Sequence, residues 1–482
     1  MTMASVLPPP TRRYLPAPLF GSLVALALCG LLPLMLIAST PAPVLSAWPL
    51  ALVSSIVAGM RFTWAVSTSM RRLYEMMTWL FIYLFLGLAP LVQLRRGIDP
   101  GTTPNLFHEY DSVALTLVIV FEITLIAGSS FARRYEPSDS NERPSISPST
   151  RPIHRGRLIF ALVALLGVST FYIARVGPSS IWSSRVDRGA AAAVGFGDDV
   201  VTTILTAVVT LGLLVAVVAL LQHRRERRIA GHKGGLLLLV VSVGFLLFLA
   251  NPIGSPRFVL ATVYLGLLAG AGVFSHTSRF RGVSVAAIGG MFLIFPILDT
   301  FRFSTQTAAQ FTDPVTSLIR GDYDSYAQIV NTAWSVDQTG ITWGNQLLGV
   351  LLFWVPRSSW PTKPQDTGIF LAEQRGYVFE NLSAPFPAEL YVNFGWIGVI
   401  IGGFILGVAL RKLDISSECR LRVIGTPTIL GSIIPFYLLL LLRGSLLQAA
   451  ANLAVMLAVW WFVTSSSRLP ERHVLPAGQR RS

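Results

Sequence analysis

The chain has 482 residues, of which 52% are hydrophobic and only 13% are charged, and its mean hydropathy is +0.61. Soluble domains carry roughly 25% charged residues, so this composition excludes a soluble globular domain and predicts an integral membrane protein. The net charge of +14 would suit a nucleic-acid-binding protein, but the distribution of charge along the chain excludes that class.

Twelve apolar blocks follow one another, each close to the roughly 20 residues that a helix needs to cross a bilayer. Pro or Gly interrupts the second, third and ninth blocks, so their ends are less sharply defined. An all-α polytopic membrane protein with about 12 transmembrane helices is therefore expected. The blocks are 19–38, 43–60, 77–94, 112–132, 158–175, 200–222, 235–251, 257–275, 283–299, 394–410, 427–443 and 446–464.

The positive charges follow the positive-inside rule when both termini are placed in the cytoplasm. The inner segments then hold most of the Lys and Arg residues, including the run RRERR at 224–228. We interpret such clusters as signals that orient the helices. Anionic lipid headgroups would also attract them, so membrane lipids are expected partners and nucleic acid is not.

The blocks divide the chain into three regions. Residues 1–299 carry the first nine predicted helices, with a disordered cytoplasmic linker near 136–152 that is rich in Pro and Ser. Residues 300–393 form one large extracytoplasmic loop with short interfacial helices, because the apolar stretch 345–355 is too short to span. Residues 394–482 carry the last three helices and a basic cytoplasmic tail.

Of the twelve cations on the predicted outer side, where the positive-inside rule otherwise disfavours them, seven in the large loop or in tight connections between helices are the most informative. An anionic ligand would explain them, and a diphosphate is a suitable candidate because guanidinium groups bind phosphate oxygens in bidentate geometry. The alternative is that they snorkel or form ion pairs with loop carboxylates such as Asp322, Asp324 and Asp366. The seven are Arg257, Arg302, Arg320, Arg357, Lys363, Arg375 and Arg443.

Glu389 is the leading candidate for a general base. It lies in the segment PFPAELYVNFG at 385–395, directly before the tenth predicted span. A helix that begins near Pro387 places Glu389 and Asn393 on one face, with Tyr391 between them at the membrane interface. The alternative is a helix-start carboxylate that complements the helix dipole. The other carboxylates on this side are Asp299, Asp322, Asp324, Asp366 and Glu373.

Other chemical signals are sparse. Glu122, midway along the fourth predicted span, is either functional or a neutral carboxyl hydrogen-bonded between helices. Asp198 and Asp199 form an adjacent acidic pair, but CxxC pairs and zinc spacings are missing, so we expect no metal and no cofactor. The large loop contains no histidine, which excludes a histidine base or a histidine-ligated metal there.

Four segments in and around the large loop resemble the Wzy-type O-antigen or oligosaccharide repeat-unit polymerases. The resemblance covers roughly 250–400, and the first six predicted helices match only in hydropathy. The segments are NPIGSPRF at 251–258, GDYDSY at 321–326, TWGNQLLG with FWVPRSSWPTKP between 342 and 364, and PFPAELYVNFGWIG at 385–398.

The resemblance implies a bacterial enzyme with a fold like the GT-C glycosyltransferases. It would join polyprenyl-diphosphate-linked oligosaccharide repeat units into a surface polysaccharide on the outer face of the cytoplasmic membrane. A flippase and a chain-length regulator would be its partners. Carried onto this sequence, the resemblance and the charges give Glu389, Arg357 and Arg257 as catalytic residues. The substrate-binding candidates are Lys363, Arg302, Tyr391, Asn393, Arg443, Asp324 and Asn251.

Three alternative functions share this architecture. An O-antigen-ligase-like transferase would use the same donor, but such ligases generally carry a histidine in the large loop. A flippase for lipid-linked oligosaccharides would distribute its charges within helices and not on one outer loop. A conventional GT-C transferase would have an acidic first outer loop, whereas the stretch 39–42 is short and uncharged. The sugars, the linkage and the oligomeric state stay open.

Overall fold

The structure, a computed structural model, describes residues 17–40, 42–135, 151–229, 231, 234–299 and 313–464. Within these ranges all regular structure is helical, apart from one isolated antiparallel β-bridge between Ile153 and Thr464. Most of the predicted linker, the first part of the large loop with Arg302, and the basic tail lie outside the described residues.

The first group of helices forms an N-terminal bundle. It comprises α1 (Ala17–Ala25), η1 (Leu26–Leu31), α2 (Leu32–Ala38), α3 (Trp48–Ser67), α4 (Leu73–Phe81), η2 (Ile82–Leu88), α5 (Ala89–Arg96), η3 (His108–Tyr110), α6 (Asp111–Phe131) and η4 (Ala132–Tyr135).

The middle of the chain builds a second bundle beside the first and then returns toward it. It comprises α7 (Arg155–Val176), α8 (Pro178–Ile181), α9 (Arg185–Phe196), α10 (Asp199–Ala207), η5 (Val208–Gly212), α11 (Leu213–Ile229), α12 (Leu236–Leu249), α13 (Arg257–Gly270), η6 (Val273–Ser275) and α14 (Thr277–Asp299).

The last part of the chain contains the described part of the large loop and the three C-terminal apolar helices α19, α20 and α21. It comprises α15 (Pro314–Ser317), η8 (Gly321–Tyr323), α16 (Ser325–Thr339), α17 (Asn345–Leu351), α18 (Thr367–Arg375), α19 (Phe386–Val423), η9 (Leu430–Ser432), α20 (Ile434–Arg443) and α21 (Leu446–Val463).

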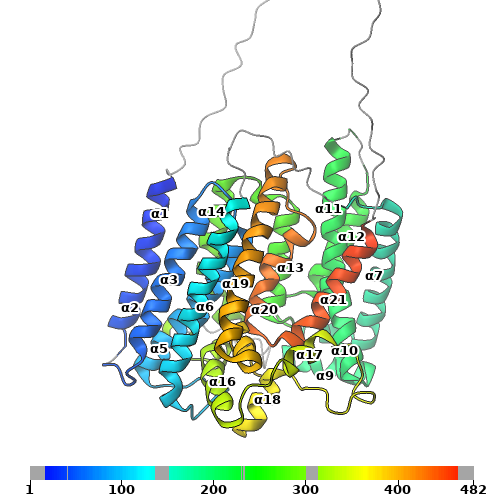
Figure 1. Ribbon diagram of the computed structural model, residues 1–482. Coiled ribbons are helices and arrows are strands. Elements are labelled where there is room, and N and C mark those ends of the chain that lie inside the picture. The colour runs from blue at the N-terminus through cyan, green and yellow to red at the C-terminus, as the bar shows by residue number, and fades with distance from the viewer. Residues whose placement is uncertain are drawn as a thin grey trace, which may run out of the picture.

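The long helices run side by side, with α13, α19 and α20 between the two bundles (Figure 1). Helices α16, α17 and α18 gather at one end of the molecule, which we call the loop end. The opposite end, where α1 starts and α7 begins, is called the terminal end. Separate apolar cores match the two bundles, one around α3, α4 and α6 and the other around α7, α11 and α21.

Eight helical segments are long and apolar enough to cross a membrane, which confirms a polytopic membrane protein. Three more predicted blocks correspond to the shorter apolar helices α12, α13 and α20, and the ninth corresponds to α14, so the total of twelve stays a prediction. The eight segments are Ala17–Ala38, Trp48–Ser67, Leu73–Arg96, His108–Tyr135, Arg155–Val176, Val200–Arg228, Phe386–Val423 and Leu446–Val463.

Helix α19 packs closely against α6 through glycines on both helices. A Cβ atom at Gly128 would lie 2.0 Å from the carbonyl oxygen of Phe404, and one at Gly407 would lie 2.2 Å from that of Leu125. Gly403 and Gly407 are four residues apart and therefore on one face, the small-residue spacing that lets membrane helices approach. Gly395 has φ 61° and breaks α19 near its start, a conformation that favours glycine.

Buried charges join α4 to α19 at the terminal end. Arg411 Nη1 lies 2.9 Å from Glu75 Oε2, and both side chains are almost wholly enclosed. Arg71 forms a second pair with Glu418 at 2.9 Å. Asp414 accepts hydrogen bonds from two backbone N–H groups at the start of α4. Each buried charge therefore has a partner, which a low-dielectric interior requires.

The large loop enters the bundle, although the sequence predicts short interfacial helices for it. Most residues of α16 are buried, and α16 packs against α6 and α19. The Tyr326 hydroxyl donates to Asp111 at the start of α6. By contrast, α17 leads into an exposed turn at which Trp354 is 65% accessible. The loop is thus partly a core element and partly a surface.

We expect Gly128→Ala to destabilise the protein, because the added methyl group must push α19 away from α6. Overpacking of this kind costs about 1–3 kcal/mol. The melting temperature of the detergent-purified protein measures the effect. Gly167→Ala in α7 is the matched control, since nothing lies within 4 Å of the Cβ position there. Equal melting temperatures for the two variants would contradict the close approach of α6 and α19.

Candidate functional site at the loop end

The segment that enters α16 is anchored against the N-terminal bundle. Gln93 Nε2 donates hydrogen bonds to the carbonyl oxygens of Leu318 and Tyr323, at 2.9 and 3.0 Å. The ring of Tyr323 stacks on Phe85 with 4.8 Å between centroids. These contacts fix the backbone on both sides of Asp322, so this carboxylate and its neighbour Asp324 have defined positions.

Two arginines meet these carboxylates from different helices. Arg257, the first residue of α13, forms an ion pair with Asp322. Arg443, the last residue of α20, lies 2.9 Å from Asp324 Oδ1 and donates through Nε to the Asp322 carbonyl oxygen at 3.0 Å. The other Asp324 oxygen accepts from the backbone N–H of Ser383 at 3.2 Å. Four charges from three distant parts of the chain therefore converge.

A cavity of about 220 Å³ opens at this cluster. Besides the two ion pairs, its wall includes Arg185 from the start of α9 and the amide side chains of Gln448 and Asn452 from α21. The cavity thus presents three guanidinium groups and two carboxylates, with uncharged hydrogen-bonding groups next to them. A polar anion with hydroxyl groups attached matches this lining.

A second pocket of about 370 Å³ adjoins the first, since Arg185 and Asn452 line both. Its wall is rich in hydroxyl groups and also carries Arg188, which is buried and donates to the Leu249 carbonyl oxygen at 2.8 Å. Hydroxyl-bearing side chains in this wall are Tyr172, Thr202, Thr203, Thr206, Thr210 and Ser255.

Glu389 is in the first turn of α19, and its side chain reaches the turn between α20 and α21. It does not line the cavity. The helix α19 begins at Phe386, which confirms the expected start near Pro387. Glu389 Oε2 accepts from the Thr367 hydroxyl at 2.9 Å, and Oε1 accepts from the Leu446 backbone N–H at 3.0 Å. Its side chain is almost fully buried. The carboxylate therefore complements the first turn of α21, while the neighbouring Ser445 lines the cavity.

Asp366 is a second carboxylate at this turn. Its Oδ1 accepts from the Gly368 backbone N–H at 2.9 Å and caps α18. Burial raises the pKa of Asp366, while the Ser445 hydroxyl and backbone N–H groups, including that of Gln448, act in the opposite direction. Asp366 and Glu389 together tie the large loop to α21.

Tyr391 and Asn393 serve the packing around α19. Asn393 Nδ2 donates to the Glu389 carbonyl oxygen at 2.8 Å, and its Oδ1 accepts from the Leu347 backbone N–H at 3.1 Å. Tyr391 packs edge-on against Trp396 with 5.5 Å between centroids. Asn393 therefore joins the start of α17 to the start of α19, away from the cavity wall.

Arg357 and Lys363 stabilise their own turn. Arg357 Nη1 donates to the Lys363 carbonyl oxygen at 2.8 Å. Lys363 Nζ donates to the carbonyl oxygens of Phe353 and Val355, at 2.7 and 2.9 Å. Partial burial, and then the charge of Arg357, lower the pKa of Lys363. The structure thus places these two cations apart from Arg257 and Arg443, although the sequence analysis grouped all four.

The remaining candidates have structural contacts. Asn251 is fully buried, donates to the Ile181 carbonyl oxygen at 2.9 Å and accepts from the Gly254 backbone N–H at 2.8 Å. It thereby shapes the turn before Arg257. Glu122 accepts from the Ser54 hydroxyl at 2.6 Å, a hydrogen bond between α6 and α3. Asp198 caps α10.

The sequence analysis missed Arg185 and Arg188, although the signal was available. Both lie between the fifth and sixth predicted spans, on the side where the positive-inside rule disfavours cations. The hydroxyl groups of the second pocket carried no such signal, because threonine is common within membrane helices. Within the described residues, His, Cys, Asp and Glu side chains form no cluster of three or more that could hold a metal ion.

No protein-family model, no curated protein and no solved structure matches the chain.

We expect Asp366→Asn to change the pH dependence of stability. Because burial raises the pKa of Asp366 in the folded state, wild-type stability falls as the pH rises from about 4 through that raised value. Asparagine does not titrate and keeps an acceptor for Gly368. The melting temperature of the variant relative to wild type should therefore increase with pH.

Asp313→Asn is the matched control, since Asp313 is an exposed aspartate that caps α15 in the same way. A constant difference between Asp366→Asn and wild type at every pH would contradict the buried position of Asp366.

Proposed function

We propose that this protein is a glycosyltransferase that joins polyprenyl-diphosphate-linked oligosaccharide repeat units, acting at the loop end on the outer face of the cytoplasmic membrane. The observation that carries the proposal is the cavity where Arg185, Arg257 and Arg443 converge with Asp322 and Asp324. The resemblance of the segments at 251–258, 321–326 and 385–398 to repeat-unit polymerases supports it, because the first two contribute Arg257, Asp322 and Asp324.

The diphosphate of the donor would bind against the three guanidinium groups. Arginine binds phosphate through parallel N–H groups, and such charge-assisted bonds are strong where water is limited. Arg257 and Arg443 are largely enclosed, at 9% and 18% side-chain accessibility. Their pairing with Asp322 and Asp324 holds them in place until the donor arrives, so the site is preorganised.

The adjoining pocket offers a place for the sugar that follows the diphosphate. Its threonine, serine and tyrosine hydroxyl groups match a carbohydrate, whose hydroxyl groups likewise both donate and accept hydrogen bonds. Arg185 and Asn452 lie at the junction of the two pockets. A diphosphate and its first sugar would then occupy neighbouring spaces, and the polyprenyl chain would remain in the membrane.

The chemistry requires one proton acceptor and stabilisation of the leaving group. An acceptor-sugar hydroxyl oxygen attacks the anomeric carbon of the donor, the bond from that carbon to the diphosphate oxygen breaks, and polyprenyl diphosphate leaves with the electron pair. The hydroxyl proton passes to Asp322. Binding of the diphosphate to Arg257 frees Asp322 from its ion pair and makes it a better base. Arg443 and Arg185 stabilise the charge that develops on the leaving group.

Glu389 has a positioning role in this proposal. Its hydrogen bond to the Leu446 backbone N–H holds the turn that carries Arg443 and Ser445. The carboxylate is enclosed by Thr367 and the start of α21, so an acceptor sugar in the cavity would reach Asp322 first.

We expect Asp322→Asn and Arg443→Lys each to lower the turnover number by about 10²–10⁴-fold, the range for loss of a general base or of leaving-group stabilisation. The assay supplies purified protein with polyprenyl-diphosphate-linked repeat units, and measures released polyprenyl diphosphate together with glycan length. Glu380→Gln and Arg175→Lys are matched controls, because both residues are exposed and near the loop end.

The outcomes separate the alternatives. Lengthened glycan with release of polyprenyl diphosphate supports a polymerase, and normal activity of Asp322→Asn removes that residue as base. If Glu389→Gln lost activity while Asp322→Asn kept it, Glu389 would be the general base. Movement of intact donor across a vesicle membrane without release would identify a flippase. Transfer of finished polymer to a different acceptor would identify a ligase.

A further inference from the structure

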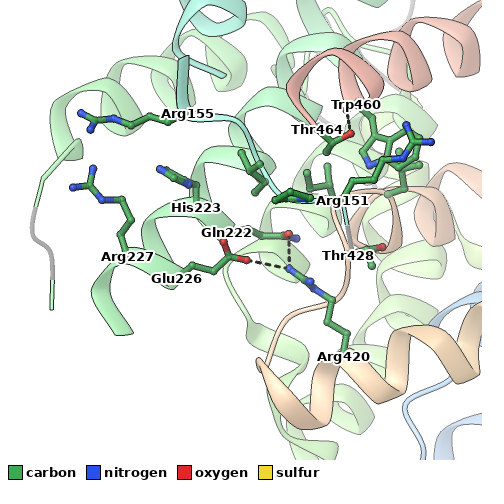
Figure 2. A pocket seen from close by; sticks show the side chains of 14 residues that line it. Arg151, Arg155, Gln222, His223, Glu226, Arg227, Arg420, Thr428, Trp460 and Thr464 are labelled. Atoms are coloured by element: carbon green, nitrogen blue, oxygen red, sulfur yellow. Dashed lines mark hydrogen bonds and ion pairs between the residues drawn. The ribbon is translucent and has the colours of Figure 1, made fainter. Parts of the chain in front are cut away.

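A larger pocket, of about 600 Å³, lies at the terminal end of the second bundle, remote from the candidate active site. The start of α7 forms one wall, where His154 N–H donates to the Val463 carbonyl oxygen at 3.0 Å next to the Ile153–Thr464 bridge. The ends of α11, α19 and α21 form the others. In Figure 2, Arg155, His223 and Arg227 lie on one side and Arg151 and Trp460 on the other.

The pocket is strongly basic. Its wall carries four arginines, Arg151, Arg155, Arg227 and Arg420, and a single acidic side chain, Glu226. Arg420 is buried and already has partners within the protein: it lies 3.4 Å from Glu226 and donates to the Pro427 carbonyl oxygen at 3.2 Å. The other three arginines are therefore in excess over the only carboxylate of the lining. Such an excess around a concave space suits an anion.

Two details distinguish this pocket from charges that only orient helices. His223 Nε2 is shielded from water and has no hydrogen-bond partner among the described residues. Arg151 lies over the ring of Trp460 at 5.2 Å, which holds it at the rim. A charge cluster that serves only topology needs neither a cavity nor an enclosed, unpaired nitrogen.

A narrow groove of about 90 Å³ continues from the pocket between α7, α11 and α12. Arg155, His223 and Arg227 line both spaces. The rest of the groove's lining is Arg224, which donates to the Gly235 carbonyl oxygen at 2.6 Å, two glycines, and four apolar side chains: Leu158, Ile159, Leu220 and Leu238. A basic pocket at the end of a transmembrane bundle thus leads into a narrow groove that is lined in part by leucine and isoleucine side chains, a shape that matches a headgroup and the first part of its acyl chain.

The geometry points to a binding site for an anionic phospholipid, with the phosphodiester between Arg155 and Arg227 and one acyl chain in the groove. Basic pockets between membrane helices on the cytoplasmic side bind such headgroups. The lipid would bridge α7 to α11 and α12. The inference does not depend on the proposed glycosyl transfer at the loop end.

The test measures the thermal stability of the purified full chain in detergent with added dioleoyl phosphatidylglycerol. Phosphatidylcholine with the same acyl chains, and water-soluble glycerol 3-phosphate, are the comparison probes. We expect phosphatidylglycerol alone to raise the melting temperature. In Arg155→Gln/Arg227→Gln its apparent dissociation constant should increase by about 30-fold, given the usual contribution of a basic side chain near an anionic lipid.

Matched variants separate the headgroup from the acyl chain. Arg279→Gln, an exposed arginine at the same end on α14, should bind like wild type. Leu238→Trp fills the groove and should weaken binding, whereas Leu237→Trp, at a position that is 77% accessible, should not.

Three results would overturn the proposal. Equal stabilisation of wild type and Arg155→Gln/Arg227→Gln would remove the pocket as the site. Equal effects of glycerol 3-phosphate and phosphatidylglycerol would assign it to a soluble phosphoester. Equal effects of phosphatidylcholine would leave only general solvation by lipid.

Discussion

The pairing of charges inside a helical bundle is the constraint on which this structure depends. A charged side chain in a low-dielectric interior costs several kcal/mol unless an opposite charge or hydrogen bonds compensate it. The protein meets this requirement at both ends. Arg411 pairs with Glu75 at the terminal end, and Arg443 pairs with Asp324 at the loop end. Each pair joins helices that are far apart in sequence, so satisfying the charges also fixes which helices are neighbours.

The same requirement explains why part of the large loop is buried in the helical bundle. Asp322 pairs with Arg257 on α13, and Asp324 pairs with Arg443 on α20. Gln93 donates hydrogen bonds to the backbone carbonyl oxygens on both sides of Asp322. Helix α16 begins directly after Asp324, and most of its residues are buried in the core. The turn between α20 and α21 becomes a junction, because Arg443 precedes it and Glu389 accepts from Leu446 just after it. The candidate active site is built around this junction.

A polar cavity in so apolar a chain has a simple physical interpretation. Arginine–carboxylate pairs contribute little to net stability when buried, and apolar residues of similar volume would often serve as well. Their concentration beside a hydroxyl-rich pocket is therefore more readily explained by a ligand than by folding. The basic pocket at the other end differs, because its arginines outnumber the one carboxylate in its lining and a groove with several leucine and isoleucine side chains leads away from it.

The sequence by itself determined the class of protein, eight of its spans and the general position of its polar residues. Long apolar runs and the asymmetry of Lys and Arg are properties of local composition, and hydrophobicity acts on each segment separately. Arg257 and Arg443 were identified in this way, as cations on the side where cations are disfavoured, and Asp324 was identified as a carboxylate of the large loop.

Only the tertiary structure decided which of these residues meet. It separates Arg357 and Lys363 from the cavity, encloses Glu389 behind a turn, and brings Arg185 from α9 beside Arg443. Local composition does not predict these contacts, because they depend on packing between helices; Arg185 and Arg443, for example, are more than two hundred residues apart. The close approach of α6 and α19 through Gly128 and Gly407 is an example of such packing, because local sequence patterns do not specify which helices will meet.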